Sequence, residues 1–303
     1  EGPAAGTDSR LFDMFVLILI PAIALFLFIL WRTRYQYPPE GSPRTLCYHK
    51  LSDSFLLEGT WTTRARFTTQ VDRLHSRGYT FIGQHDFLES LDESVQKKTN
   101  RLLLTFDDGY EQLYDLYFEV LAPRQIPLLV FLVTAYAGRT NSWELSLGRK
   151  PFRHLSWQQV REMAARGVEF GSHGLNHSDL TRLWGDALAD QLVTSRRAIR
   201  DEAGIDARCF SYPFGRYNDR VVLAVKNAGY DAAFSLYPRH SNRQIDRFAL
   251  RRNAVYIIDT PMTLGCKLEK NPLFWVEEMK CRGINAVAML TPMLTRFQPG
   301  RDK

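Results

Sequence analysis

The sequence predicts an α/β fold built on a parallel sheet, either open and doubly wound or closed into a barrel. From Thr45 onward, short apolar segments alternate with longer helical stretches. Several of these stretches end in Arg-Gly or Ala-Gly, a helix stop in which Gly is free to adopt a left-handed conformation. Six or seven strand–helix units in roughly 210 residues suit a barrel, complete or incomplete.

The elements follow in a regular order along the chain. The expected strands are Thr45–His49, Leu102–Phe106, Leu128–Val133, Glu169–Gly171, Cys209–Tyr212 and Ala232–Ser235. The expected helices are Arg64–Arg77, Tyr110–Arg124, Ser156–Ala165, Trp184–Ala203 and Asp219–Ala228. In a parallel α/β fold the chemistry collects at the carboxyl ends of the strands, so the residues after each strand are the first candidates for a site.

An apolar segment precedes this domain. Leu11–Trp31 carries no charge from Met14 onward, and as a helix it would span about 31 Å, close to the bilayer core of about 30 Å. A cleaved signal peptide would need a shorter apolar region and a small-residue cleavage site, which FILWRTRYQY does not offer. We therefore predict a tail (1–10), a transmembrane helix (11–31) with the lipid bilayer as partner, and a Pro-rich linker (32–44).

Composition excludes several other classes of protein. The 303 residues are 45% hydrophobic, which is too apolar for a disordered or collagen-like chain. The net charge of +6 is spread along the chain, and no basic run or motif predicts a nucleic-acid partner. The four cysteines form no CxxC pair, and their spacing does not argue for disulfides.

Four polar motifs stand at predicted strand ends. Asp107-Asp108-Gly109 follows one strand, and this acidic pair is either functional or a helix N-cap. Ser172–His177 follows another and offers two His four residues apart. The two remaining motifs are Phe210–Gly215, a rigid aromatic turn, and Tyr48-His49. One carboxylate with two imidazoles is a recurring set for a hydrolytic divalent metal, and a second carboxylate beside it suits a general base.

The combination resembles a known family. TFDDGY at Thr105–Tyr110, SHGLNH at Ser172–His177 and YPFG at Tyr212–Gly215 are similar to the motifs of the polysaccharide deacetylase family, the NodB-homology or carbohydrate esterase family 4 domain. Together with Tyr48-His49 and LSWQQVREMAARG, they look most like the branch of poly-N-acetylglucosamine and exopolysaccharide deacetylases. The resemblance implies a distorted, often incomplete (β/α) barrel, here the catalytic domain at 45–259, which removes N-acetyl groups from an N-acetylated glycan.

The resemblance also implies roles for single residues. Asp107 matches the catalytic base and Asp108, His173 and His177 match the ligands of one divalent ion, expected to be zinc. The backbone N–H of Tyr110 would help to hold the oxyanion. The expected sugar groove is formed by His49, Tyr212, Pro213 and Phe214.

Three positions depart from the family pattern. Gly174 replaces a Ser or Thr between the two His, which is a minor change because that hydroxyl is not a ligand. Phe210 stands where many members have an Arg that orients the catalytic Asp. The late motif with a general-acid His is absent, since the last His is His240 in a dissimilar segment, so proton return falls to Asp107 or His49.

Two alternatives to the deacetylase stay open at this stage. The missing Arg and His would also fit a weakly active or inactive subunit that acts as a structural component of a membrane complex with other membrane proteins. A metal hydrolase for another amide or ester is the second alternative. Metal content and amine release from an acetylated glucosamine oligomer discriminate between an enzyme and an inactive subunit.

The side of the membrane on which the domain lies is predicted from weaker evidence. Three Arg after the predicted span, against Arg10 before it, favour a cytoplasmic domain. The family resemblance favours the outside of the inner membrane, because anchored relatives act on exported polymer, and we expect a single-pass protein with an extracytoplasmic domain. Residues 260–303 lie beyond the resemblance and are expected to supply last barrel elements or a contact with a partner or the membrane.

Overall fold

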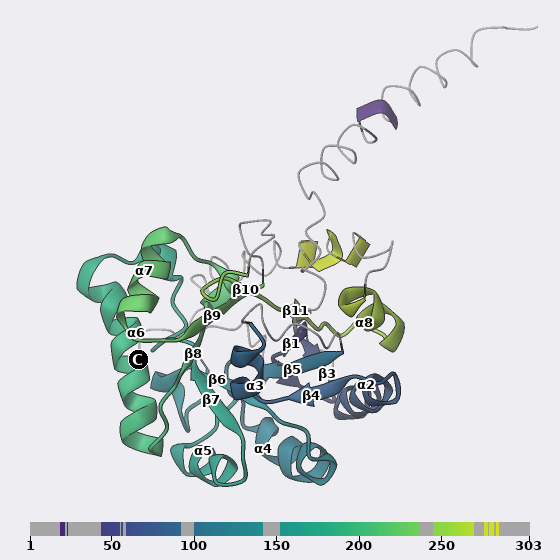
Figure 1. The fold of residues 1–303 in the computed structure, drawn as a ribbon, viewed down its shortest axis with the longest axis horizontal. Coiled ribbons are helices and arrows are strands. Elements are labelled where there is room, and N and C mark those ends of the chain that lie inside the picture. Colours follow the sequence, from purple (N-terminus) through teal and green to yellow (C-terminus); the bar gives the residue numbers. More distant parts are fainter. Residues whose placement is uncertain are drawn as a thin grey trace, which may run out of the picture.

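The fold is seen in a computed structural model of the chain (Figure 1). The structure describes residues 19–21, 23, 44–54, 56, 59–91, 100–141, 152–236, 245–269, 276–277, 279–281 and 283–284. Most of the predicted transmembrane helix and of the linker lies outside these residues. Among the described residues, no helix is long and apolar enough to cross a membrane.

Parallel strands alternate with helices along most of the chain. The strands are β1 (Arg44–Tyr48), β2 (Lys50–Leu51), β3 (Trp61–Thr62), β4 (Thr80–Ile82), β5 (Arg101–Phe106), β6 (Leu129–Leu132), β7 (Glu169–Ser172), β8 (Cys209–Ser211), β9 (Ala232–Ser235), β10 (Leu250–Arg251) and β11 (Asn253–Ala254). The helices are α2 (Arg64–Ser76), α3 (Gln84–Glu89), α4 (Gln112–Leu116), α5 (Trp157–Ala164), α6 (Gly185–Ala203), α7 (Asp219–Asn227) and α8 (Pro261–Leu268).

The main sheet is a nearly closed parallel barrel, as the sequence predicts. Its strand order is β10-β9-β8-β7-β6-β5-β1-β11, and β4 also pairs with β5. The segment from Leu250 to Ala254 pairs at both ends of this order, because β10 lies against β9 and β11 lies against β1. Arg252 is the single residue between β10 and β11. The seam of the barrel is therefore bridged by one short stretch of chain with Arg252 at its centre.

Alternation along the strands separates an inner from an outer core. On β5, Leu102, Leu104 and Phe106 belong to the large cluster that packs the helices against the sheet. Leu103 belongs to a second cluster, with residues of β6, β8, β9 and β10. Because side chains alternate between the two faces of a strand, Asp107 at the end of β5 lies on the same face as Leu103. The polar site therefore continues the inner apolar cluster at the carboxyl end of the barrel.

The predicted helices and strands all appear, with shifted ends. The predicted helix Tyr110–Arg124 is α4 followed by a π-helical turn (Tyr117–Leu121) and a 3-10 turn (Ala122–Arg124) that contains Pro123. Helix α6 begins one residue later than expected and ends at Ala203, followed by the C-cap residue Gly204, whose φ is +72°. The sequence reasoning did not identify β2, β3, β4, α3, β10 or β11, which are short, and a strand of two residues carries no periodic signal.

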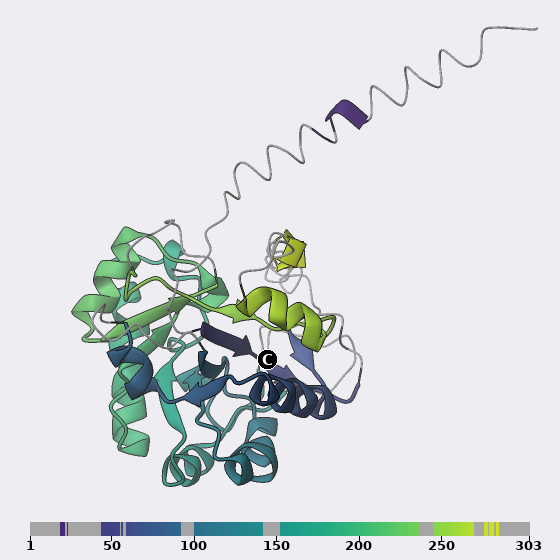
Figure 2. The same ribbon diagram turned by 45° about the vertical axis from the view of Figure 1, so that its right-hand side comes forward.

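Helix α8 lies in the predicted C-terminal extension and packs beside α2 (Figure 2). It begins with a capping box in which Thr260 and Thr263 bond each other's backbone N–H groups. The ammonium group of Lys267 donates to the carbonyl oxygen of Ala254 in β11 at 2.7 Å and to Asp259 at 2.5 Å. These buried contacts join the helix to the last strand of the barrel. The apolar stretch Ile284–Leu294 lies outside the described residues beyond Ile284.

Candidate active site

The loop after β5 holds the two acidic residues that the sequence singles out. Asp108 and Gly109 both have a φ of +68°, and a Cβ on Gly109 would lie 2.6 Å from a methyl carbon of Leu132. Asp108 therefore adopts a left-handed conformation that is uncommon for a residue with a side chain. The carbonyl oxygen of Asp108 contacts the imidazole Nδ1 of His154 at 2.8 Å, which helps to hold this turn. His154 was not among the predicted site residues.

Asp108, His173 and His177 come together as one triad of possible metal ligands. The Nε2 atoms of His173 and His177 lie 3.7 and 3.5 Å from Oδ1 of Asp108. Around a tetrahedral ion with bonds of about 2.0–2.2 Å, neighbouring ligand atoms are separated by roughly 3.3–3.6 Å. Both imidazole nitrogens thus already have nearly the separation from the Asp108 carboxylate oxygen that a zinc-like ion requires.

The two imidazoles are oriented and kept neutral by their surroundings. Nδ1 of His173 lies 2.7 Å from the carbonyl oxygen of Ser211, so this nitrogen carries the proton and Nε2 is left to act as a ligand. Burial lowers the pKa of His173, and burial followed by the charge of His173 lowers that of His177. Neutral imidazole is the form that binds a metal ion.

Backbone strain is concentrated around the triad. Of the four described non-glycine residues with positive φ, three are Asp108, His177 (+58°) and Phe214 (+59°). The ring of Phe214 packs edge-on against His177, with 4.6 Å between centroids. Strained conformations of this kind persist where the surrounding structure holds them, and they cluster at functional sites.

Asp107 is held by a buried arginine that the sequence reasoning missed. Arg252 donates to Oδ1 and Oδ2 of Asp107 at 2.6 and 2.7 Å, and both side chains are almost completely buried. Arg252 also donates to the hydroxyl of Ser211, which in turn donates to Asp107. The expectation that this chain lacks an arginine at the base is therefore wrong.

Phe210, which stands at the position expected for the arginine, and Arg252 point their side chains to different faces of the sheet. Phe210 packs in the outer cluster against Tyr212 and Tyr230, and Arg252 reaches Asp107 from the seam of the barrel. The only local signal is period-two alternation, which puts Arg252 on the same face as the inward Leu250 and opposite Arg251. Nothing in the sequence shows that Arg251 and Arg252 lie where the chain passes from one edge of the sheet to the other.

The electrostatics of Asp107 follow from this pair. Burial alone would raise the pKa of Asp107, but the charge and hydrogen bonds of Arg252, together with the neighbouring His173 and His49, outweigh it and the pKa lies well below its ordinary value. Asp107 is therefore a carboxylate at neutral pH. Its Oδ2 lies 3.8 Å from Nε2 of His173, beside the triad and outside it.

Of the remaining predicted residues, some face the site and the others are buried in the structure around it. His49 lies with Nε2 4.0 Å from Oδ2 of Asp107, and burial lowers its pKa to about 4. The Tyr110 ring is buried against His154. Tyr212 is fully buried and donates to the carbonyl oxygen of Phe248. Pro213 is buried as well, so of the three predicted groove residues in this turn only Phe214 is partly exposed.

Comparison with known proteins agrees with this geometry. The model of the family described as Polysaccharide deacetylase matches residues 94–233. A poly-beta-1,6-N-acetyl-D-glucosamine N-deacetylase of Staphylococcus epidermidis is 26% identical over 211 residues, which cover 67% of this chain and 70% of the relative.

Solved structures show the same fold. IcaB from Ammonifex degensii has a TM-score of 0.62 and 25% identity, and the match covers 74% of this chain and 94% of IcaB. The Streptococcus pyogenes deacetylase PplD has a TM-score of 0.64 and 19% identity, with 75% of this chain and 98% of PplD covered. Residues 94–233 thus match the polysaccharide deacetylase family, and the motifs, the barrel and these relatives are similar to the NodB-type branch of that family.

Proposed function

We propose that the protein is a metal-dependent hydrolase that removes acetyl groups from N-acetylglucosamine units of a polysaccharide. The observation that carries this proposal is the triad of Asp108, His173 and His177 beside the clamped carboxylate of Asp107. The substrate class is supported by the relative from Staphylococcus epidermidis, whose name gives poly-beta-1,6-N-acetyl-D-glucosamine.

The triad would hold one divalent ion, and we propose zinc. The set of one carboxylate and two imidazoles, at nearly tetrahedral spacing, fits zinc and leaves a position open for water or substrate. When bound, such an ion polarises a carbonyl oxygen and lowers the pKa of water.

Asp107 would accept the proton of the attacking water as a general base. The water oxygen becomes bonded to the acetyl carbon, the carbon–nitrogen bond breaks, and the products are acetate and a free amine. Arg252 holds Asp107 in one orientation and stabilises its charged form, so a protonated Asp107 is a strong acid that returns its proton readily to the leaving nitrogen. His49 is neutral at pH 7 because its pKa is about 4, and it would serve as a hydrogen-bonding neighbour of Asp107 in this cycle.

We further propose that residues 11–31 anchor the protein in the inner membrane, with the catalytic domain outside the cytoplasm. The apolar, uncharged sequence of this segment supports an anchor. The resemblance to enzymes that act on exported polymer supports the outer side.

Amine release from a β-1,6-linked N-acetylglucosamine oligomer tests the proposed activity directly. The full chain is loaded with one equivalent of Zn²⁺ and compared with the metal-free protein and with Asp107→Asn. We expect metal-dependent release of amine and acetate in equal amounts. If the loaded wild-type protein released neither from this oligomer, nor from chitin oligomers, the proposed function would be wrong.

A further inference from the structure

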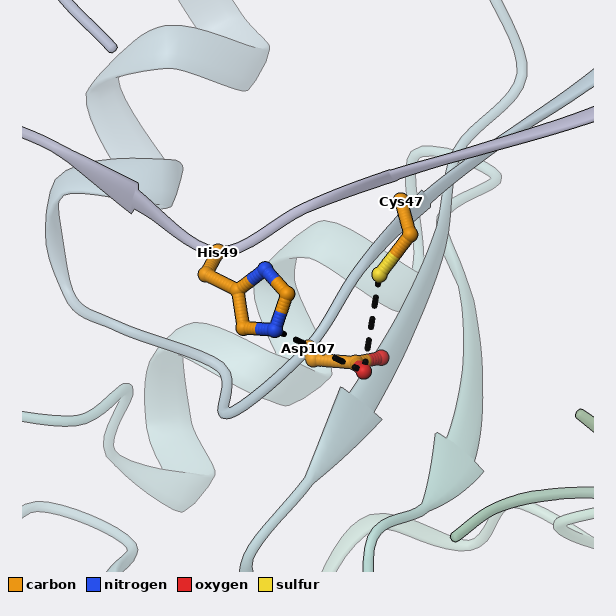
Figure 3. A group of neighbouring side chains, drawn as sticks. All are labelled: Cys47, His49 and Asp107. Atoms are coloured by element: carbon orange, nitrogen blue, oxygen red, sulfur yellow. Dashed lines mark hydrogen bonds and ion pairs between the residues drawn. The ribbon is translucent and has the colours of Figure 1, made fainter. Parts of the chain in front are cut away.

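A second group of metal-ligating side chains lies on the other side of Asp107. Cys47, His49 and Asp107 offer a sulfur, a nitrogen and an oxygen atom that all lie within 4.8 Å of one another. Figure 3 shows the sulfur of Cys47 and the imidazole of His49 both pointing toward the carboxylate of Asp107. None of the roles assigned above explains why a thiol is placed at this point.

The strand register creates this group. Cys47 of β1 is paired with Thr105 of β5, so β1 and β5 end side by side and the backbone N–H of Asp107 donates to the carbonyl of Tyr48. Because side chains alternate, Cys47 and His49 both face inward while Tyr48 joins the outer cluster. The three residues are thus presented by two adjacent strand ends and do not depend on a long flexible loop.

The distances fit a small tetrahedral ion. Sγ of Cys47 lies 3.5 Å and Nε2 of His49 lies 4.0 Å from Oδ2 of Asp107. For bonds of about 2.3 Å to sulfur and about 2.1 Å to nitrogen and oxygen, neighbouring ligand atoms are separated by roughly 3.4–3.6 Å. A shift of the His49 side chain by a few tenths of an ångström would bring its Nε2 to this separation from Oδ2 of Asp107.

The chemistry of the group differs from that of the triad. A thiolate and an imidazole favour Zn²⁺ and other soft or borderline ions, whereas a carboxylate with two imidazoles accepts a wider range of divalent metals. Cys47 and Asp107 are fully buried, and the His49 side chain is 15% exposed, so the ion would enter past His49.

We propose that Cys47, His49 and Asp107 form a second, inhibitory site for Zn²⁺ or a similar thiophilic divalent ion. An ion there uses a lone pair of Oδ2 of Asp107, the atom that we have assigned to accept the proton of water. Binding at this site therefore removes the general base, and the enzyme stops when the ion is in excess.

The charges around the group predict that this site is weaker than the triad. Arg252 donates to both oxygens of Asp107, and its positive charge opposes a cation at the same carboxylate. An ion held by the triad would be a second positive neighbour, because His173 of the triad lies 3.8 Å from Oδ2 of Asp107. The first equivalent of metal should therefore fill the triad, and the second should fill the cysteine site at higher concentration.

Cobalt and zinc titrations of the full chain test the proposal. The inhibition arm rests on the proposed function, but the binding arm does not. Co²⁺ is added beyond one equivalent, and the near-ultraviolet charge-transfer band of a thiolate bound to cobalt is recorded. We expect this band to grow with the second equivalent. In parallel, excess Zn²⁺ should lower deacetylation by roughly a hundredfold or more, since a hundredfold is the lower end of what a general base contributes.

Matched variants assign the band to its residue. Cys47→Ser keeps a hydrogen-bond donor to Asp107 but should lose the cobalt–thiolate band, and its activity should become insensitive to excess Zn²⁺ relative to its own value at one equivalent. Cys209→Ser is the control, because Cys209 is an equally buried thiol in the apolar cluster inside the barrel. It should keep both the band and the inhibition. If Cys47→Ser folds poorly, His49→Gln supplies the same comparison and should weaken the second binding step at least tenfold.

The possible failures can be told apart. A thiolate band that survives in both Cys47→Ser and His49→Gln, or a wild-type protein that never shows the band, would overturn the second site. An active enzyme that tolerates excess Zn²⁺ while showing the band would overturn its inhibitory role. A protein with the band but without amine release at any metal concentration would leave the second site in place and refute the proposed function.

Discussion

At the scale of single residues, the site depends on two carboxylates that are neighbours in sequence and have different partners. Asp108 faces the imidazoles of His173 and His177, and Asp107 faces the guanidinium of Arg252. The left-handed turn at Asp108 points the two side chains in these separate directions. These different partners are what the proposed roles require, with Asp108 as a metal ligand and Asp107 as the general base.

Removing the charge of Asp107 tests its role as the base. Asp107→Asn keeps the shape of the side chain and leaves the three ligands of the triad in place. We expect normal metal content and a loss of deacetylation by roughly two to four orders of magnitude. Metal analysis and amine release on the same sample measure both. Near-normal turnover would show that another group, with His49 as the first candidate, accepts the proton.

Arg252 is a positioning residue whose removal should change the pH profile. In Arg252→Gln, Asp107 stays buried without a positive partner, so burial raises its pKa. The acidic limb of the profile of kcat/KM against pH should therefore move to higher pH, and the unfolding free energy should fall by about 3–5 kcal/mol. Arg252→Lys restores the charge without the two-pronged contact and should recover part of the shift. An acidic limb that is unchanged in Arg252→Gln would contradict this role.

At the scale of secondary-structure elements, most of the site could be predicted from the residues that follow the predicted strands. The run before Asp107 is long and apolar enough to be identified as a strand, and two His four residues apart follow the short strand at Glu169–Gly171, so the triad could be predicted from the sequence. Arg252 could not, because it stands between two strands of two residues each. The place of Cys47 beside Asp107 could not be predicted either, because it depends on the register of β1 and β5, which the sequence does not state.

Helix α8 provides a test of how the C-terminal segment is attached. Asp259 is buried and accepts hydrogen bonds from Lys267 and Lys280 at 2.5 and 2.6 Å. Burial alone would raise the pKa of Asp259, but Lys267 and then Lys280 outweigh it and the pKa is lowered. A carboxyl with a lowered folded-state pKa contributes stability that is present above its unfolded pKa of about 3.9, and this contribution is lost as the pH falls through the folded value.

Asp259→Asn should therefore destabilise the protein by about 3–5 kcal/mol at neutral pH, because it leaves the buried Lys267 with only the more distant carboxylate of Glu277, 4.0 Å away, as a negative neighbour. It should also make the unfolding free energy less dependent on pH below about pH 4. Urea unfolding at several pH values measures both effects. Equal stability of the variant and the wild type at pH 7 would show that α8 does not depend on this ion pair.

At the scale of the whole molecule, closure of the barrel and assembly of the site are the same event. The chain from Leu250 to Ala254 pairs with both edges of the sheet, and Arg252 at its centre clamps the carboxylate of Asp107. The order of strands and helices along the sequence predicted a barrel. It did not predict how the barrel closes, since that contact joins segments about 200 residues apart.

The placement of the domain relative to the membrane is a prediction at the same scale. With the segment 11–31 as an anchor and the domain outside the cytoplasm, protease added to intact spheroplasts should remove the catalytic domain. A cytoplasmic protein serves as the control for lysis. Protection of the domain until the membrane is permeabilised would place it in the cytoplasm, as the count of arginines flanking the segment suggests.

The central claim is that Asp108, His173 and His177 hold the metal ion that the reaction needs. Its most direct test is the metal content of His173→Ala after loading with one equivalent of Zn²⁺ and dialysis, with circular dichroism as the check on folding. The account predicts about one zinc ion per wild-type chain, and a folded variant that has lost most of its metal together with deacetylation. Full zinc occupancy in a folded His173→Ala protein would contradict it.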